Sequence, residues 1–400
     1  MELAMEDAPG EAGLARPGLR ADDDYLTVTM LAAGLAGILA RRPGNGGGAR
    51  RSDGLLPAAW RAGYSRLWWR CQEQGVRAPD SDLDLLAWCA SPFAAWPVEL
   101  SLSAQDMQSC LVVGEELSGF AEQGARLAGA DVEAEWTENR VYQALRTAAL
   151  ASGGDDDAEA ERVYAVLRRR LIDHPVLTDL ELKQWEREFA LTDGSGQTYV
   201  RRLVDEAYVP RPAPGTYQYF RCPGCGNTVP DAGSPCGTAG CLADPAGEVS
   251  VPALAVVYEQ HRATRRFIHD PGLVEARLLD ALASQELAGR VRVTAYPGLD
   301  ALDLLVEFLK NDGARVEVAE TWGADAKDQE SARLLARAFS WPGSPRCDRR
   351  FLVLPEHRAG QPGYVEDLRA ELDGRMAGIE VVAEKRLISM VRAAARTAAR

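Results

Sequence analysis

The sequence lacks a hydrophobic run long enough to cross a bilayer, and this absence argues against a membrane protein. The apolar stretch at 31–40 is too short, and Asp22, Asp23 and Asp24 precede it where a secretory signal carries basic residues. Long low-complexity tracts are missing too, and a content of 46% hydrophobic and 26% charged residues is typical of globular domains. We therefore expect a globular, cytoplasmic protein.

A surplus of basic charge is also missing, because the formal net charge is −14 at pH 7. Such a charge argues against indiscriminate binding to nucleic acid. Three segments of the C-terminal half, 261–266, 346–350 and 385–400, are nevertheless locally basic. A local basic patch can bind a phosphate backbone on an otherwise acidic protein, but it can equally be a solvated helix face.

The length and the changing sequence pattern predict several domains. Residues 1–24 mix Gly, Pro, Ala and Glu without a period, which predicts disorder. Residues 25–209 have helical periodicity and contain no spacing that suggests an active site. A cysteine cluster lies within 215–250, and helical and strand patterns alternate over 255–400. We expect an α+β multi-domain protein with a helical N-terminal region, a cysteine-rich module and a C-terminal α/β domain.

Four cysteines that lie close together predict a metal site: Cys222, Cys225, Cys236 and Cys241. The two-residue spacing of the first pair, with Gly226 following it, forms a tight turn that directs both thiolates at one metal. Four sulfur ligands complete a tetrahedral shell, so we expect a structural Zn²⁺ in a zinc ribbon. A ribbon that has lost its metal and a set of free thiols are the alternatives, whereas disulfides are not expected in a cytoplasmic protein.

The C-terminal segment has the predicted order helix, three strands, helix and strand. The predicted helices are 273–286 and 331–339, and three of the strands are 291–295, 301–308 and 351–354. Asn311–Asp312–Gly313 predicts a hairpin turn, after which the return strand is either 315–320 or 322–327. This order is that of the core of the restriction-endonuclease-like, PD-(D/E)XK, fold.

Asp303, Asp325 and Lys327 are the candidate catalytic residues. Period-two alternation puts Asp325 and Lys327 on one face of a strand, and Asp303 on the partner strand reaches that face. The two carboxylates would hold Mg²⁺, a hard cation that prefers oxygen ligands and lowers the pKa of a bound water. Lys327 would orient that water and stabilise developing negative charge. Glu275, near the start of the preceding helix, is a candidate third carboxylate.

Alternatives to this site stay open. If the register differs, Glu317 or Glu320 supplies the second carboxylate, although neither is followed two residues later by Lys. Asp303 and Asp325 can also be strand-end or surface acids without a role in chemistry. The residues around the motif are unusually small for a buried strand: Gly323, Ala324 and Ala326.

His357 and Arg358 follow the last core strand and are candidate nucleic-acid contacts. The histidine would act by proton transfer at the scissile phosphate, and the arginine by bidentate pairing with it. A loop pair at the domain surface is the alternative.

Several of these residues lie in short motifs: Tyr296-Pro297-Gly298-Leu299-Asp300, Asp303-Leu304, Asp325-Ala326-Lys327-Asp328, Leu354-Pro355-Glu356-His357-Arg358 and Pro362-Gly363-Tyr364. With the preceding zinc ribbon, and over about 217–392, they resemble the restriction-endonuclease-like proteins encoded beside pPIWI-RE proteins. The latter are prokaryotic PIWI/Argonaute-like proteins of three-gene islands that also encode a DinG-type helicase. The resemblance implies a metal-dependent DNA nuclease in defence against foreign DNA, with the PIWI/Argonaute-like protein and the helicase as partners.

Two other functions are compatible with the same residues. A catalytically inactive nuclease fold would bind DNA or act as a scaffold in that defence system. A zinc-ribbon interaction protein would have no role at nucleic acid at all.

Overall fold

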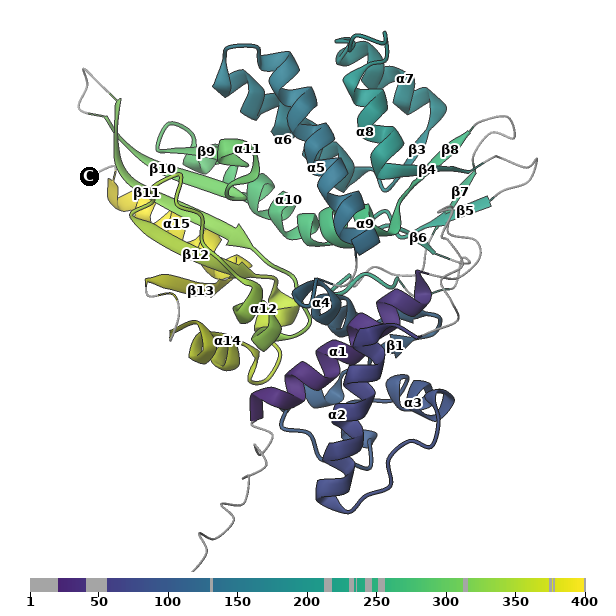
Figure 1. Ribbon diagram of the computed structural model, residues 1–400. Helices are drawn as coiled ribbons and strands as arrows, with labels where there is room; N and C mark the ends of the chain where they lie inside the picture. The colour runs from purple at the N-terminus through teal and green to yellow at the C-terminus, as the bar shows by residue number, and fades with distance from the viewer. Residues whose placement is uncertain are drawn as a thin grey trace, which may run out of the picture. The chain divides into compact units, whose positions relative to one another are not determined.

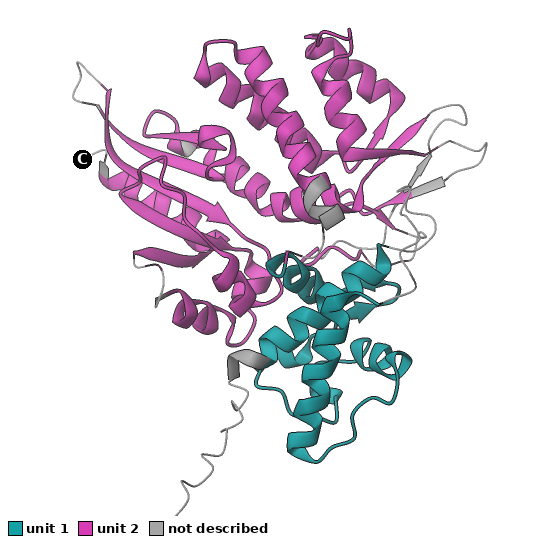
Figure 2. Cartoon of the chain, in the orientation of Figure 1, with its two compact units in different colours: residues 1–128 teal, residues 129–400 magenta. Residues whose placement is uncertain are grey.

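The computed structural model describes residues 21–40, 56–129, 132–211, 218–229, 234, 236–241, 247–250, 256–311, 316–373, 376 and 378–398. The chain forms two compact units, Met1–Ala128 and Gly129–Arg400 (Figure 2). This division falls inside the predicted helical domain 25–209, and the domain bounds given above stay a prediction. Residues 1–20 of the predicted disordered segment and 312–313 of the predicted hairpin turn lie outside the described residues. No described helix is both long and apolar enough to cross a membrane.

The first unit consists of short helices around an aromatic core. Its elements are α1 (Ala21–Leu39), α2 (Ala58–Gln74), α3 (Asp82–Cys89), η1 (Phe93–Ala95), η2 (Asp106–Gln108), β1 (Val112–Val113), β2 (Glu116–Leu117) and α4 (Gly119–Leu127). Helices α1 and α2 cross closely at Gly34, which has no side chain. A Cβ there would lie only 2.5 Å from the Cα of Trp60. Trp60, Phe93 and Phe120 are fully buried in this core.

Helix α1 begins at Ala21, within the segment 1–24 for which we predicted disorder. Asp24 explains why this part of the segment is helical instead of disordered, because its side chain is buried and not solvated. The Asp24 carboxylate accepts a 2.6 Å hydrogen bond from the backbone N–H of Ser101 and pairs with Arg70 at 3.3 Å. Long-range partners of this kind are not visible in a local sequence pattern.

The second unit opens with four helices and a small sheet. The helices are α5 (Val132–Gly153), α6 (Asp157–Asp173), α7 (Asp179–Glu188) and α8 (Tyr199–Ala207). The sheet has the order β3-β8-β4, with β3 at Val176–Thr178, β8 at Val257–Gln260 and β4 at Tyr208–Arg211. Helix α6 starts where Asp156 accepts hydrogen bonds from the N–H groups of Ala158 and Glu159. The segment predicted as helical therefore also contributes strands.

The cysteine-rich module is built on three short antiparallel strands. They are β5 (Gln218–Arg221), β6 (Thr228–Val229) and β7 (Gly247–Ser250), in the order β6-β5-β7. Cys222 and Cys225 lie in the turn that joins β5 to β6, and the N–H of Cys222 donates to the carbonyl of Asn227 at 2.9 Å.

A five-stranded mixed sheet in the order β13-β12-β11-β10-β9 forms the centre of the C-terminal part (Figure 1). Its strands are β9 (Val291–Ala295), β10 (Leu304–Asn311), β11 (Val316–Ala326), β12 (Arg349–Leu354) and β13 (Ile379–Ala383). Strand β10 pairs antiparallel with both β9 and β11, whereas β11 with β12 and β12 with β13 pair parallel. The expectation of a mixed α and β protein is confirmed.

Helices cover both faces of this sheet. The helices of the C-terminal part are α9 (Arg262–Thr264), η3 (Arg265–His269), α10 (Asp270–Leu282), η4 (Gln285–Leu287), α11 (Pro297–Asp300), α12 (Ala332–Ala338), α13 (Glu356–Ala359), α14 (Tyr364–Asp373) and α15 (Glu384–Ala398), of which α10 and α15 cover one face of the sheet and α12 and α14 the other. Phe351 and Val353 of β12 pack with α10 and α15, while Leu352 and Leu354 pack with α12 and α14. Burial of both faces explains why this strand is a continuous apolar run.

Strand β11 resolves the ambiguity about the return strand, because it runs unbroken from Val316 to Ala326 and so contains most of both predicted segments. A register shift opposite Phe308 and Leu309 absorbs one residue of β11. The small residues near its end have a packing reason. A Cβ on Gly323 would lie 2.6 Å from the Sγ of Cys347 and 3.1 Å from the ring of Trp341. The loop that carries these two residues therefore requires a small residue in the strand.

Candidate functional site

The end of β11 brings three of the predicted site residues together. Asp303 directly precedes β10, whose Leu304 pairs with Ala324 of β11, so Asp303 lies beside the last residues of β11. One Asp303 carboxylate oxygen accepts a 2.6 Å hydrogen bond from the N–H of Ala326. The Lys327 ammonium forms an ion pair with the carboxylate of Asp325. Asp303 and Asp325 are 6% and 8% exposed, so neither is a surface acid.

Glu275 joins the same site from α10, and it is 2% exposed. Its Oε2 accepts a 2.8 Å hydrogen bond from the hydroxyl of Tyr296. The guanidinium of Arg168 binds both carboxylate oxygens, with Nε to Oε2 at 3.2 Å and Nη2 to Oε1 at 3.0 Å. The predicted third carboxylate is thus near the other two, and its oxygens are engaged by Arg168 and Tyr296.

Two further charged residues of the site were not predicted, Arg168 of α6 and Asp300. Nη1 of Arg168 lies 3.2 Å from the carboxylate of Asp300 and donates to the hydroxyl of Tyr142 at 3.0 Å. The Arg168 side chain is 3% exposed, and its guanidinium stacks 4.8 Å from the centre of the Tyr296 ring. The sequence gives no signal for Arg168, since it precedes its partners by more than a hundred residues. Asp300 lies in a motif quoted above, but without an assigned role.

Backbone strain marks the turn that leads to the site. Tyr296, Leu299 and Asp300 have φ values of 50°, 55° and 84°, in the left-handed region that favours glycine. The N–H of Gly298 donates to the carboxylate of Glu161 on α6 at 2.7 Å. The N–H of Tyr296 donates to the carbonyl of Asp303 at 2.9 Å. These bonds from both sides hold the strained turn in place.

We call Glu275, Asp300, Asp303 and Asp325 the acidic cluster. Burial raises the pKa of Asp303 well above its usual range, and the charge of Glu275 raises it further, while Lys327 opposes both. Burial also raises the pKa of Asp300, against the influence of Arg168. Burial alone would lower the pKa of Lys327, but Asp325 and Asp303 raise it, so the ammonium stays charged.

The donor set of the acidic cluster fits a hard divalent cation. Four carboxyl groups face only two cationic side chains, Arg168 and Lys327, and the raised pKa values of Asp303 and Asp300 reflect this shortage of positive charge as well as burial. One oxygen of Asp300 is buried and accepts no hydrogen bond from the described residues. Carboxylate oxygens in such numbers are the ligands that Mg²⁺ and Mn²⁺ prefer.

His357 and Arg358 lie on α13 and both bind Asp328, the residue after Lys327. Nε2 of His357 lies 3.1 Å from the Asp328 carboxylate, and Nε of Arg358 donates to it at 2.8 Å. Burial would raise the pKa of Asp328, but these two partners lower it. Contact of His357 and Arg358 with a phosphate stays a prediction.

The four cysteines of the ribbon converge as their spacing predicts. Their sulfur atoms lie within 4.8 Å of one another, the approach that tetrahedral coordination of a single ion requires. Sγ of Cys222 lies 3.4 Å from that of Cys241, and Sγ of Cys225 lies 3.2 Å from that of Cys236, too far for a disulfide. Burial would raise the pKa of Cys222, but the N–H groups of Cys225 and Gly224 and the neighbouring thiols lower it to about 7. A thiolate metal centre fits this geometry.

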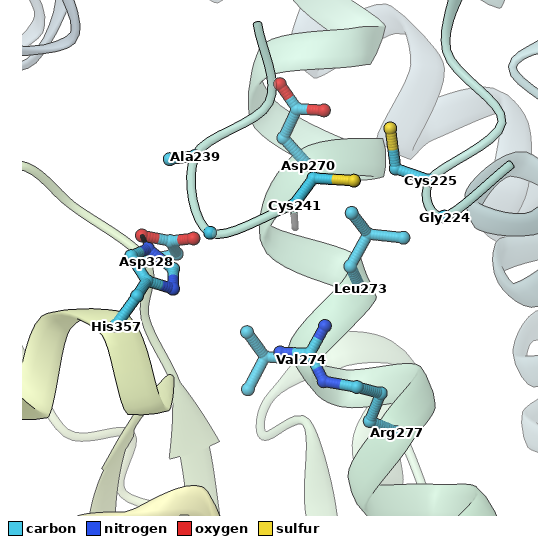
Figure 3. A pocket seen from close by; sticks show the side chains of 11 residues that line it. Gly224, Cys225, Ala239, Cys241, Asp270, Leu273, Val274, Arg277, Asp328 and His357 are labelled. Atoms are coloured by element: carbon cyan, nitrogen blue, oxygen red, sulfur yellow. Dashed lines mark hydrogen bonds and ion pairs between the residues drawn. The ribbon is translucent and has the colours of Figure 1, made fainter. Parts of the chain in front are cut away.

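A cavity of about 300 Å³ lies between the ribbon and the nuclease-like sheet (Figure 3). Cys225 and Cys241 line it from the ribbon, Arg277 lines it from α10, and Asp328 and His357 line it from the sheet side. A Cβ on Gly240 would overlap the His357 imidazole, so the ribbon backbone packs directly on that ring. The ribbon thus contacts the residues that follow the candidate site.

Comparison with known proteins gives two family matches. Residues 272–399 match the family described as REase associating with pPIWI_RE, and residues 50–178 match pPIWI_RE three-gene island domain Y. The first match contains the acidic cluster and Lys327, and the second contains Arg168. No curated protein and no solved structure matches the chain.

Proposed function

The chain is a pPIWI-RE island protein with a restriction-endonuclease-like domain, and from this premise we propose that it is a divalent-metal-dependent nuclease that hydrolyses DNA phosphodiester bonds. The observation that carries the proposal is the convergence of Asp303, Asp325 and Lys327 in one site where buried carboxyl groups outnumber the cationic side chains. Asp303 and Asp325 are the proposed ligands of Mg²⁺, and Lys327 is the proposed cation at the scissile phosphate.

Each of these side chains has a distinct task in the proposed reaction. A bound Mg²⁺ supplies positive charge that offsets the charge developing on the phosphate. Asp303 is held for binding by the N–H of Ala326, which leaves its second oxygen for the ion. Asp325 would hold the ion through its carboxylate, and the Lys327 ammonium, which pairs with Asp325 in this structure, would orient the attacking water and stabilise the phosphate oxygens.

The proposal extends to the partners and to the ribbon. The descriptions of the two matching families support association with a PIWI/Argonaute-like protein of the same island. By resemblance we propose a DinG-type helicase as a further partner, and defence against foreign DNA as the shared role. The four cysteines are proposed to hold a structural Zn²⁺, since a complete sulfur shell leaves no position for a substrate.

A catalytically inactive scaffold is the second candidate, and one observation favours it. Lys327 already pairs with Asp325, and Arg168 already pairs with Glu275 and Asp300, so part of the charge of the cluster is satisfied within the chain. The shortage of positive charge around Asp303 and Asp300 argues for the nuclease, because a divalent ion would offset the cost of ionising these buried carboxyl groups.

A cleavage assay separates the two candidates. Plasmid and single-stranded DNA are incubated with Mg²⁺ or Mn²⁺ and the full chain, with and without co-encoded partners. We expect cleavage by the wild type and its loss in both Asp325→Ala and Lys327→Ala. Lys183→Ala is the matched control, because Glu181-Leu182-Lys183 repeats the motif pattern on helix α7, where Lys183 is 59% exposed. DNA binding without cleavage under every condition would establish the scaffold, and cleavage that survives both site substitutions would exclude this site.

A further inference from the structure

Arg168 joins the site from outside the nuclease-like segment. It belongs to α6, within residues 50–178 that match domain Y, whereas the acidic cluster lies within 272–399. Its guanidinium bridges Glu275 and Asp300, the two carboxylates that the proposed metal ligands do not include. It is buried, and aromatic rings of Tyr142 and Tyr296 flank it.

The position of Arg168 is fixed by the helix that carries it. The next residue, Arg169, binds Asp280 of α10 with two hydrogen bonds of 2.8 and 3.0 Å. Ile172, one turn further on, packs so closely on Gly272 that a Cβ there would lie 2.5 Å from its side chain. At the other side of Arg168, Glu161 binds the strained turn before Asp303. Helix α6 is therefore docked on both elements whose carboxylates bind Arg168, namely α10 with Glu275 and the strained turn with Asp300.

The charge of Arg168 has a consequence for metal binding. Two buried carboxylates without a cation attract one, and a guanidinium and a divalent ion compete for the same oxygens. Because Arg168 occupies both oxygens of Glu275 and one oxygen of Asp300, it leaves this pair of carboxylates a single unengaged oxygen, on Asp300, and so competes with a second ion for them. The remaining pair, Asp303 and Asp325, serves one ion.

We propose that Arg168 is a positioning residue that takes the place of a second divalent ion, so that the nuclease site holds a single ion on Asp303 and Asp325. This inference rests on the proposed function. It makes the helical segment of the chain part of the site: domain Y contributes the cation that holds Glu275 and Asp300, and the nuclease-like domain contributes the carboxylates. In this arrangement Glu275 supports the site through Arg168 and does not bind the ion.

The test is a count of bound Mn²⁺ on the full chain, by electron paramagnetic resonance of free Mn²⁺ and by calorimetric titration, with zinc content measured separately. We expect one Mn²⁺ per chain in the wild type and two in Arg168→Met, whose neutral side chain of similar length frees Glu275 and Asp300. Arg168→Lys keeps the charge and is expected to bind one. Arg162→Met is the matched control, because this exposed arginine of the same helix pairs with Glu159, outside the acidic cluster, and it is expected to bind one.

A double variant tests whether the second ion binds at the freed carboxylates and not elsewhere on the chain. Arg168→Met with Glu275→Gln removes one of the two freed carboxylates, so the count should return to one. If Arg168→Met folds only with metal, the count is made after refolding in Mn²⁺, and failure to obtain a folded two-ion protein overturns the proposal. One ion in both the wild type and Arg168→Met, or two in the wild type, also overturns it and leaves the proposed nuclease intact. No Mn²⁺ in the wild type contradicts the proposed metal site itself.

Discussion

Substitution of Asp303 by asparagine should stabilise the protein in the absence of divalent ions while it removes the proposed activity. Asp303 is 6% exposed, and its pKa is raised by burial and by Glu275. The asparagine amide oxygen can accept the same hydrogen bond from the N–H of Ala326, so the change deletes a charge and keeps the contact. The charge of Asp303 thus lowers the free energy of unfolding, and its proposed role as a metal ligand explains why the residue is an aspartate.

The expected gain follows from the charges around this carboxylate. Like charges a few ångströms apart in a partly buried site repel by about 1–4 kcal/mol, and the attraction of Lys327 offsets part of this repulsion. We therefore expect Asp303→Asn to gain about 1–2 kcal/mol in free energy of unfolding, which is a few degrees in Tm.

The gain should also depend on pH with a defined sign. Because the folded pKa of Asp303 is above its unfolded value, the wild type loses stability as pH rises from about 4 through the folded pKa. The variant has no such group, so its advantage should be absent below about pH 4 and grow toward neutral pH. Differential scanning calorimetry over this range, in buffer freed of Mg²⁺ and Mn²⁺, measures it.

The matched control is Asp205→Asn, which removes an exposed carboxylate paired with Arg201 on α8. Its effect should stay within about 0.5 kcal/mol. If Asp303→Asn is no more stable than the wild type at neutral pH, or if the difference does not change with pH, the electrostatic account of the acidic cluster is wrong.

Two further predictions concern the ribbon. Cys236→Ser should lower both the zinc content from one per chain and the thermal stability, whereas Cys347→Ser should leave the zinc content unchanged. Atomic absorption measures the zinc content. Full zinc retention by Cys236→Ser would count against the four-sulfur site. Gly240→Ala should lower the free energy of unfolding by about 2–4 kcal/mol, because the new Cβ overlaps His357 and the backbone φ is 70°. Gly289→Ala should lower it by about 1 kcal/mol, because φ is 76° there but the Cβ meets open space, so only backbone strain contributes. Equal losses of unfolding free energy in chemical denaturation would mean that the ribbon does not pack on His357.

The order of elements in the C-terminal domain was predictable because local patterns specify it. Alternating and continuous apolar runs predict β9, β10 and β12, and Asp325 lies at the end of β11 as predicted, whereas Lys327 lies just beyond the last residue of that strand. The length of β11 was ambiguous because its first half is exposed and its second half is small and buried. The packing of Cys347 and Trp341 on Gly323 explains why that position is a glycine, and these contacts are not local.

The partners of the site residues were the part that sequence patterns did not predict. Arg168 stands among three consecutive arginines of an amphipathic helix, and nothing in that helix distinguishes it from Arg169 or Arg170. Asp300 belongs to the site because a strained turn redirects the chain, and residues other than glycine at positive φ give no pattern. His357 and Arg358 were predicted from their charge, but their shared bond to Asp328 depends on how helix α13 meets the segment that follows β11.

The most direct test of the proposed site is to locate a bound divalent ion in a crystal of the full chain grown with Mn²⁺. Diffraction data on both sides of the manganese absorption edge separate Mn²⁺ from zinc in the ribbon. The account predicts a manganese peak in contact with the carboxylates of Asp303 and Asp325, beside Lys327, and its absence in crystals of Asp325→Ala. A manganese peak elsewhere, or none at these carboxylates under conditions that support DNA cleavage, would contradict it.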